Sequence, residues 1–225
     1  MTGAARYAVY FAPEPAHALW QAGCDWLGRD AADARDLRPA PPQRSEPWHY
    51  GFHATLKPPM RLQPGLDEAD LDAALQAVAA GMGSFQMPRL HVDRLADFVA
   101  LRPEATLDRS HALWRLADAC VTALDRFRAP LSAEELARRL RHPLAPEALQ
   151  RLQAWGYPHV LDGWRFHMTL SDSLPVAQQV AVLDDARGHF APALARTLRC
   201  TDLCLFRQGA PDQPFVLKRR YRLAD

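Results

Sequence analysis

Apolar and polar positions alternate along this chain with two different periods, and the periods predict which segments form strands and which form helices. The first strand is predicted at Arg6–Ala12, an aromatic and β-branched run that Pro13 ends. The other predicted strands are Gly51–Lys57, Ser84–Leu95, Asp97–Leu101, Trp164–Ser171, Thr197–Phe206 and Phe215–Arg222. Helical spacing predicts helices over Ala16–Leu27, from an Asp67 cap to Gly81, over Asp108–Phe127, from Pro146 to Gly156, and over Val176–His189. The segment Gly28–Pro47, rich in charge, Pro and Ala, is predicted to be a loop.

Two of the predicted strands carry nearly the same five residues, FHATL at positions 52–56 and FHMTL at positions 166–170. Successive side chains of a strand point to opposite faces, so the second and fourth residues of each string share one face. The first, third and fifth residues are apolar and are expected to pack into the core. Each string therefore presents an imidazole and a hydroxyl together, His53 with Thr55 and His167 with Thr169.

The order of elements after the two strings is also the same. A helix and then two strands follow each of them, which predicts two βαββ-like lobes related by a pseudo-twofold axis. Residues 129–162, in which Ser132 and Glu135 have the spacing of a capping box, have no counterpart and are predicted to be a helical insertion. The expected fold is α+β, bilobed and internally duplicated around a central cleft, in a single domain over residues 1–225.

Composition and charge narrow the class of protein. The apolar content of 48%, the charged content of 24% and the net charge of +1 are typical of a globular protein and give no case for an electrostatically driven nucleic-acid binder. The four cysteines are scattered without a C-x-x-C pair, which favours reduced core residues over disulfides or a zinc site. The chain shows no signal-peptide region and no run of transmembrane length, so we expect a cytoplasmic protein without a membrane partner.

The paired His-x-Thr-Leu strings resemble the signature of the 2H phosphoesterase superfamily. The segments Arg6–Pro13, Tyr50–Lys57, Phe127–Leu131 and Trp155–Pro158 resemble more narrowly an uncharacterised branch that is associated with phosphonate metabolism. The resemblance spans nearly the whole chain. It implies a bilobed, duplicated fold and hydrolysis of a phosphodiester, often a cyclic one, without a metal ion or another cofactor. The catalytic residues that it implies are His53, Thr55, His167 and Thr169.

Two histidines suit phosphodiester hydrolysis because an unperturbed imidazole titrates near pH ~6.5. A neutral imidazole takes a proton from the attacking water, and a charged one gives a proton to the departing alkoxide. Each such group typically contributes on the order of 10²–10⁴-fold. The hydroxyls of Thr55 and Thr169 would donate hydrogen bonds to the non-bridging oxygens. The symmetry of the two strings leaves open which histidine is the base.

Three further residues are candidates for binding the substrate. Lys57 lies four residues after His53, and Arg165 lies two residues before His167, so strand alternation places both cations on the side of the cleft. There they would neutralise phosphate charge, and a solvated cation at a strand end is the alternative for each. Tyr10 is the candidate among the tyrosines, although most strand tyrosines pack in the core.

The leading hypothesis is a phosphoric diester hydrolase that acts on a small phosphorylated metabolite. The association with phosphonate metabolism suggests a ribosyl cyclic phosphate. One alternative is a phosphodiesterase or ligase of 2′,3′-cyclic or 2′-5′ RNA ends, which the near-neutral charge disfavours. A second alternative, of a different class, is a non-catalytic nucleotide- or RNA-binding module that uses the same cleft. The sequence assigns no oligomeric state.

Overall fold

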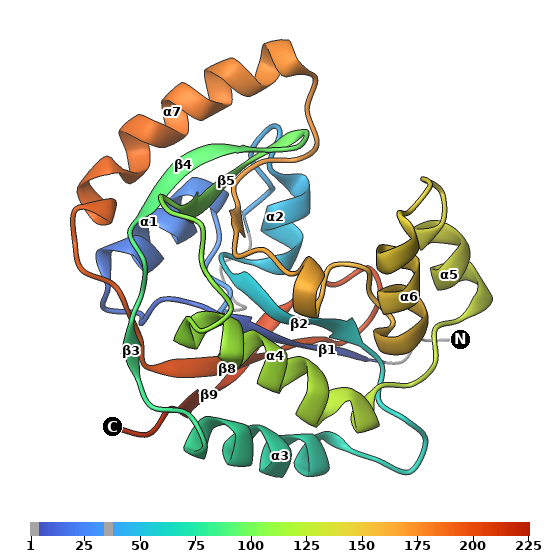
Figure 1. Ribbon diagram of the computed structural model, residues 1–225. Coiled ribbons are helices and arrows are strands. Elements are labelled where there is room, and N and C mark those ends of the chain that lie inside the picture. The colour runs from blue at the N-terminus through green and yellow to red at the C-terminus, as the bar shows by residue number, and fades with distance from the viewer. Residues whose placement is uncertain (1–4, 34–37) are drawn as a thin grey trace.

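The fold was analysed in a computed structural model, which describes residues 5–33 and 38–225. Over this part of the chain the main sheet has seven strands in the order β4-β5-β6-β2-β1-β8-β9, and all neighbours are antiparallel (Figure 1). The strands of the main sheet are β1 (Arg6–Phe11), β2 (Ala54–Met60), β4 (Leu90–Leu95), β5 (Phe98–Pro103), β6 (Met168–Thr169), β8 (Asp202–Gln208) and β9 (Val216–Arg222). Two further strands, β3 (Phe85–Gln86) and β7 (Arg199–Cys200), form a small separate sheet.

Helices pack on each half of the main sheet. The helices are α1 (Ala18–Leu27), α2 (Ser45–Tyr50), α3 (Glu68–Ala80), α4 (Ala112–Leu124), α5 (Ala133–Arg139), α6 (Pro146–Trp155) and α7 (Val176–Leu194), with 3₁₀ turns at Asp125–Phe127 and Leu161–Gly163. Helix α7 packs on β4 and β5 and against α1, whereas α4 packs on β2 and against α3. This arrangement confirms the α+β class and gives each half of the sheet its own pair of helices.

The two halves of the sheet do not coincide with the two halves of the sequence. The C-terminal hairpin β8–β9 pairs with β1, and the hairpin β4–β5 from the first half of the sequence pairs with β6. Helices α5 and α6, within the segment predicted to be an insertion, project from the body on the right of Figure 1. The capping box predicted at Ser132 and Glu135 is present at the start of α5.

The motif strands differ in extent from their predicted ranges. Strand β2 starts at Ala54 and continues through Pro58 and Pro59 to Met60, so the prediction that the two prolines end the strand is wrong. The pairing of β1 with β2 shifts register twice between Tyr7 and Tyr10, and these irregularities let residues without an N–H lie within the strand. The second motif strand is reduced to the two residues of β6.

Other helices and strands also begin or end at residues that differ from the predicted ones. The predicted loop 28–47 ends early because α2 begins at Ser45, and residues 34–37 of that loop lie outside the described residues. The strand predicted over 84–95 is divided into β3 and β4 around Pro88, which cannot donate to a ladder. Helix α7 runs five residues beyond the predicted end, to Leu194.

The predicted apolar faces of the two motif strings are buried. All six apolar residues of the strings are at most 5% exposed: Phe52, Ala54, Leu56, Phe166, Met168 and Leu170. They belong to one continuous core that also contains residues of α1, α4 and α7. The side chains that alternate with them are consequently turned to the opposite face of the sheet.

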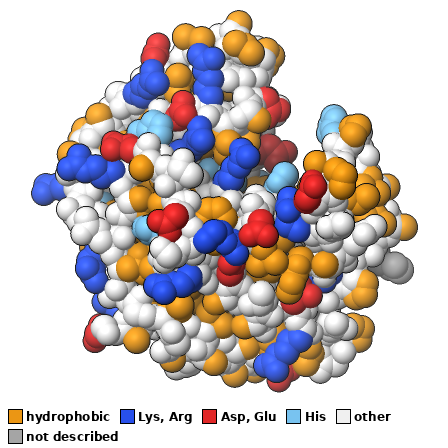
Figure 2. Space-filling view, in the orientation of Figure 1, with side chains coloured by type: hydrophobic (Ala, Val, Ile, Leu, Met, Phe, Trp, Pro, Cys, Tyr) orange, Lys and Arg blue, Asp and Glu red, His pale blue; other side chains and the backbone are white. Residues whose placement is uncertain are grey.

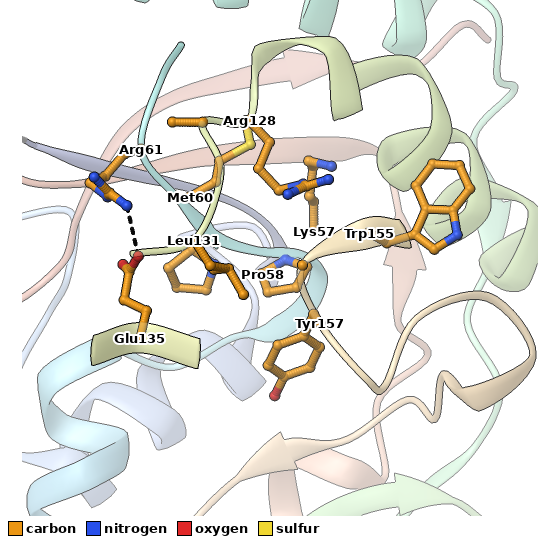
Figure 3. A pocket seen from close by; sticks show the side chains of 12 residues that line it. Lys57, Pro58, Met60, Arg61, Arg128, Leu131, Glu135, Trp155 and Tyr157 are labelled. Carbon is orange, nitrogen blue, oxygen red and sulfur yellow. Dashed lines mark hydrogen bonds and ion pairs between the residues drawn. The ribbon is translucent and has the colours of Figure 1, made fainter. Parts of the chain in front are cut away.

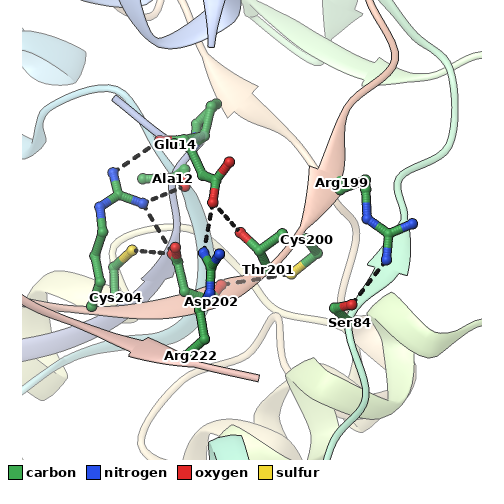
Figure 4. Close-up of polar contacts among 11 residues, drawn as sticks. Ala12, Glu14, Ser84, Arg199, Cys200, Thr201, Asp202, Cys204 and Arg222 are labelled. Atoms are coloured by element: carbon green, nitrogen blue, oxygen red, sulfur yellow. Dashed lines mark hydrogen bonds and ion pairs between the residues drawn. The ribbon is translucent and has the colours of Figure 1, made fainter. Parts of the chain in front are cut away.

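A buried polar cluster ties the C-terminal strands to the end of β1 (Figure 4). Arg220 donates to Oδ1 of Asp202 at 2.9 Å and to the carbonyl oxygens of Ala12 and Pro13. Cys204 donates to the same carboxylate oxygen at 3.3 Å. All four cysteines are free thiols, and three of them are buried. Burial raises the pKa of the Cys120 thiol to about 12. The prediction that the cysteines lie in the core is thus confirmed for Cys120, Cys200 and Cys204, whereas Cys24 is half-buried.

No helix in the described ranges is long and apolar enough to cross a membrane.

A tight contact behind the first motif predicts a matched pair of stability effects. A Cβ at Gly23, in α1, would lie 2.2 Å from Cγ of Phe52, next to His53, whereas a Cβ at Gly188, in α7, meets nothing within 4 Å. We expect Gly23→Ala to destabilise the protein by about 1–3 kcal/mol through overpacking. Gly188→Ala should stabilise it by about 0.5–1 kcal/mol because Ala is the better helix former. Urea unfolding measures both, and equal effects of the two substitutions would contradict the packing described here.

Candidate active site

One antiparallel pairing brings the two motif strings together. Ala54 of β2 is the partner of Met168 of β6. Directly opposed residues of a ladder share a face, so their neighbours in both strands point to the other face. Continuing the register by one residue places Thr55 across from His167 and His53 across from Thr169. The structure therefore gathers the four predicted catalytic side chains on one face of two adjacent strands: His53, Thr55, His167 and Thr169.

Both imidazoles are held by the same backbone contact. Nδ1 of His53 lies 2.8 Å from the carbonyl oxygen of Gly51, and Nδ1 of His167 lies 2.8 Å from that of Arg165. A carbonyl oxygen only accepts, so Nδ1 carries the proton in each ring and Nε2 is the unprotonated nitrogen. In His53, Nε2 lies 3.3 Å from the hydroxyl of Thr55. The two rings are thus oriented alike, each by the carbonyl two residues earlier in the chain.

His53 lies within a group of aromatic rings. Tyr10 stacks on it with ring centroids 3.7 Å apart, and the rings of Tyr50 and Phe206 follow at 6.3 and 6.2 Å. Burial, and to a smaller extent the charge of His167, lowers the pKa of His53 to about 4, against the opposing effect of the hydrogen bond to Gly51. His53 is consequently neutral near pH 7, and the lone pair on Nε2 accepts a hydrogen bond from the hydroxyl of Thr55.

His167 has a different environment. Its ring packs against that of Phe98, with centroids 5.7 Å apart. Burial lowers its pKa, the hydrogen bond to Arg165 opposes this, and the charges of His159 and Arg102 lower it further. The two residues before it in the chain, Arg165 and Phe166, line a groove of about 530 Å³ together with Arg102 and others. Because the charge of His167 acts on the pKa of His53, the two imidazoles lie within electrostatic range of each other.

The three predicted substrate-binding residues have different environments. Tyr10 is 1% exposed and its ring stacks on that of His53, so it packs against the imidazole and offers little surface to a substrate. Arg165 is exposed beside His167. Lys57 is 2% exposed, and its ammonium donates to the carbonyl oxygen of Val121 and to Oδ1 of Asp125 at 3.3 Å. The expectation that Lys57 offers a free cation to the cleft is therefore not met.

The register of β2 gives the reason for the position of Lys57. Thr55 pairs with Tyr10 while Lys57 pairs with Val9, so β2 has one extra residue at this point. An extra residue interrupts the alternation of faces, and counting in steps of two from His53 fails beyond it. Figure 3 shows Lys57 beside Arg128, at a pocket between the end of β2 and the segment that carries Trp155 and Tyr157.

Two tryptophans that were not among the predicted site residues position the motif strands. Nε1 of Trp164 donates to the carbonyl oxygen of Thr55 at 2.8 Å, and Nε1 of Trp26 donates to that of Leu170 at 2.8 Å. Each bond joins a motif string to a part of the chain that is remote in sequence. Periodicity carries no signal for such contacts, since a tryptophan in an apolar stretch is equally suited to packing alone.

Residues 5–33 and 38–225 contain no group of three or more His, Cys, Asp or Glu side chains that could hold a metal ion. The groups that the described site offers for chemistry are the two imidazoles, the two hydroxyls and the nearby guanidinium groups.

Similar proteins were found among curated sequences and among solved structures. The chain is 37% identical over 225 residues to "Ribose 1,5-bisphosphate phosphokinase PhnN" of Janthinobacterium sp. (strain Marseille), covering 94% of this chain and 49% of that protein. It is 35% identical over 228 residues to the protein of the same name of Laribacter hongkongensis (strain HLHK9), covering 95% and 51%. The chain thus spans about half the length of the curated relatives it matches.

The solved structures are more distant. They include E. coli LigT complexed with 3′-AMP, with a TM-score of 0.46, 13% identity and coverage of 99% of this chain and 100% of that one. Usb1 of Kluyveromyces marxianus gives a TM-score of 0.36 at 12% identity, covering 96% and 99%. A family model described as "Protein of unknown function (DUF1045)" matches residues 55–216. This span contains the whole second string and, from the first string, Thr55 and Leu56. The chain belongs to this DUF1045 family.

Proposed function

We propose that this protein is a metal-independent phosphodiesterase that hydrolyses a small, cyclic phosphodiester by acid/base catalysis with two histidines. The observation that carries the proposal is the pairing of Ala54 with Met168, which turns two imidazoles and two hydroxyls to one face. Both imidazoles keep Nε2 available because Nδ1 is bound to a carbonyl oxygen. This is the set of groups that in-line displacement at phosphorus needs.

The electrostatics favour His53 as the base and His167 as the acid. Protonated His167 lowers the pKa of His53, so the single proton that the pair shares resides on His167. Nε2 of His53 then takes a proton from water as its oxygen attacks phosphorus. The bond from phosphorus to the leaving oxygen breaks, and His167 gives that oxygen its proton. Thr55 and Thr169 donate hydrogen bonds to the non-bridging oxygens, where charge accumulates.

The names of the curated relatives suggest a substrate. A kinase of the P-loop class needs the motif G-x-x-x-x-G-K-[ST], in which a glycine precedes the lysine. Both lysines of this chain, Lys57 and Lys218, follow a leucine, so this sequence does not contain the motif. We therefore assign the phosphokinase of the relatives' name to the half of those proteins that this chain does not match. Water that opens a 1,2-cyclic phosphate of ribose 5-phosphate at the bond from phosphorus to O2 yields ribose 1,5-bisphosphate. Such a ribosyl cyclic phosphate is our proposed substrate, and a kinase that acts on ribose 1,5-bisphosphate would consume the product.

Removal of either imidazole should abolish turnover. We expect His53→Ala and His167→Ala each to lower kcat/KM by about 10²–10⁴-fold, since each removes one proton-transfer group. The control is His142→Ala, at an exposed position in the segment between α5 and α6, which should leave kcat/KM unchanged. Assays use ribose 1,2-cyclic phosphate 5-phosphate and a 2′,3′-cyclic nucleotide, with circular dichroism to check the fold. Full activity of either variant would refute the assignment, and a preference for the nucleotide would point to RNA ends.

The pKa values predict an activity maximum on the acid side of neutrality. The base must be neutral, so kcat/KM falls below the pKa of His53, about 4. The acid must be protonated, so kcat/KM also falls above the pKa of His167, which lies below the ordinary value of 6.5. We expect a bell with its maximum below pH 6.5 in the free enzyme. A kcat/KM that rises steadily from pH 5 to pH 9 would contradict the shared-proton mechanism.

Chelation should leave the reaction intact. Because imidazoles and hydroxyls supply every group of the proposed mechanism, we expect the same kcat in excess EDTA as in buffer alone. Dialysis against chelator followed by addition of Mn²⁺ or Zn²⁺ provides the comparison. Activity that is lost on chelation and restored by either ion would show that a metal ion takes part.

A further inference from the structure

The inserted helix α5 ends in Arg139, which forms no ion pair with any carboxylate in residues 5–33 and 38–225. Cζ of Arg139 lies 4.7 Å from the centroid of the Tyr157 ring. Its Nε is buried and has no hydrogen-bond partner among the described residues. A buried donor of this kind normally has an acceptor, and leaving one unsatisfied costs about 1–3 kcal/mol. The guanidinium of Arg139 is thus held in place by an aromatic ring, while its Nε has no acceptor among the described residues.

The nearest acidic candidate on the same helix is engaged elsewhere. Glu135, one turn before Arg139, accepts hydrogen bonds from Arg61 at 2.7 Å and from the backbone N–H of Ser132 at 2.8 Å. Within the described part of the chain, Arg139 makes no ion pair. Burial lowers the pKa of Arg139, and the opposing effects of Tyr157, Glu135 and Tyr50 are smaller. An anion from solution would oppose the effect of burial further.

Tyr157 connects this arginine to the side of the site that contains His53. Burial raises the pKa of Tyr10, and the neighbouring phenols Tyr50 and Tyr157 raise it further, so the three phenols lie close together. Tyr10 and Tyr50 are the rings that surround His53, with centroids at 3.7 and 6.3 Å from its own. The guanidinium of Arg139 thus contacts a phenol whose charge acts on Tyr10, the ring that stacks on His53.

The charge of Arg139 also affects the pKa of His159, a histidine whose charge in turn affects His167. Burial lowers the pKa of His159, and the charges of Arg151, Arg165 and Arg139 lower it further. His159 in turn acts on the pKa of His167. Figure 2 shows the molecule hollowed between the projecting lobe, which contains α5 and α6, and the body of the protein.

We propose that Arg139 binds a second, non-reacting phosphate of the substrate, so that the enzyme selects a small metabolite with a terminal phosphomonoester in addition to the reacting phosphodiester. Arginine suits this role because its planar fork of donors matches phosphate oxygens. Tyr157 holds the guanidinium plane in position, and this reduces the entropy lost on binding. The proposal rests on the proposed function and extends it from the reacting phosphorus to the rest of the substrate.

A pair of substrates that differ only in the second phosphate tests the proposal. They are ribose 1,2-cyclic phosphate with and without the 5-phosphate. Arg139→Ala should lower kcat/KM by about 10–100-fold for the 5-phosphorylated compound, as expected for loss of hydrogen bonds to a charged group, and leave the other compound unaffected. Arg139→Lys should retain part of the effect because it keeps the charge. The control is Arg138→Ala, at the adjacent exposed position on α5, which should change neither substrate.

Equal losses on both substrates would mean that Arg139 only supports the fold of the insertion, and no loss on either would also overturn the proposal. Calorimetric titration of the His167→Ala protein with ribose 5-phosphate separates this proposal from the proposed function. If the wild-type protein opens no cyclic phosphate but Arg139→Ala weakens this binding tenfold or more, the phosphodiesterase assignment fails and the anion site stands. If the wild-type protein is active and the binding is unchanged by Arg139→Ala, the anion site fails alone.

Discussion

The site depends on the short antiparallel pairing of β2 with β6, in which Ala54 lies opposite Met168. Both residues are buried, so a slip of one residue in either strand would move two apolar side chains out of the core. The same slip would separate the imidazole and hydroxyl of one string from those of the other. Packing of the core therefore sets the geometry of the proposed site, since the buried side chains alternate with the imidazoles and hydroxyls along the same two strings.

Contacts from remote parts of the chain stabilise this short ladder. Strand β6 comprises only Met168 and Thr169, and it pairs with β5 on one side and β2 on the other. The indole N–H groups of Trp26 and Trp164 bind carbonyl oxygens of the two strings, and carbonyl oxygens of Gly51 and Arg165 orient the rings. Two strings of similar sequence thus acquire similar tautomers, while their surroundings differ. Aromatic rings enclose His53, and guanidinium groups lie around His167 and the inserted helices.

The duplicated strings made the α+β class and the buried faces of the strands predictable, because alternation with a period of two is a local property. The position of Lys57 was not predictable in this way. Its ammonium pairs with Asp125 since β2 contains an extra residue after Thr55, and an irregularity of register depends on the partner strand. Arg139 was likewise missed because its neighbours, among them Tyr157, are brought to it only by the folding of the insertion. Local patterns identified the two imidazoles and two hydroxyls that share a face, and tertiary contacts determined the environments of Lys57 and Arg139.

The central claim is that His53 and His167 act on the same phosphorus atom in one step. A double-mutant cycle on single-turnover rates tests it most directly, using His53→Ala, His167→Ala and the double variant with a cyclic ribosyl phosphate. If the two imidazoles work as a unit, the double variant should be about as slow as the slower single variant. Losses that multiply, so that the double variant is slower by the product of the two single effects, would show that the histidines act independently and would contradict the account.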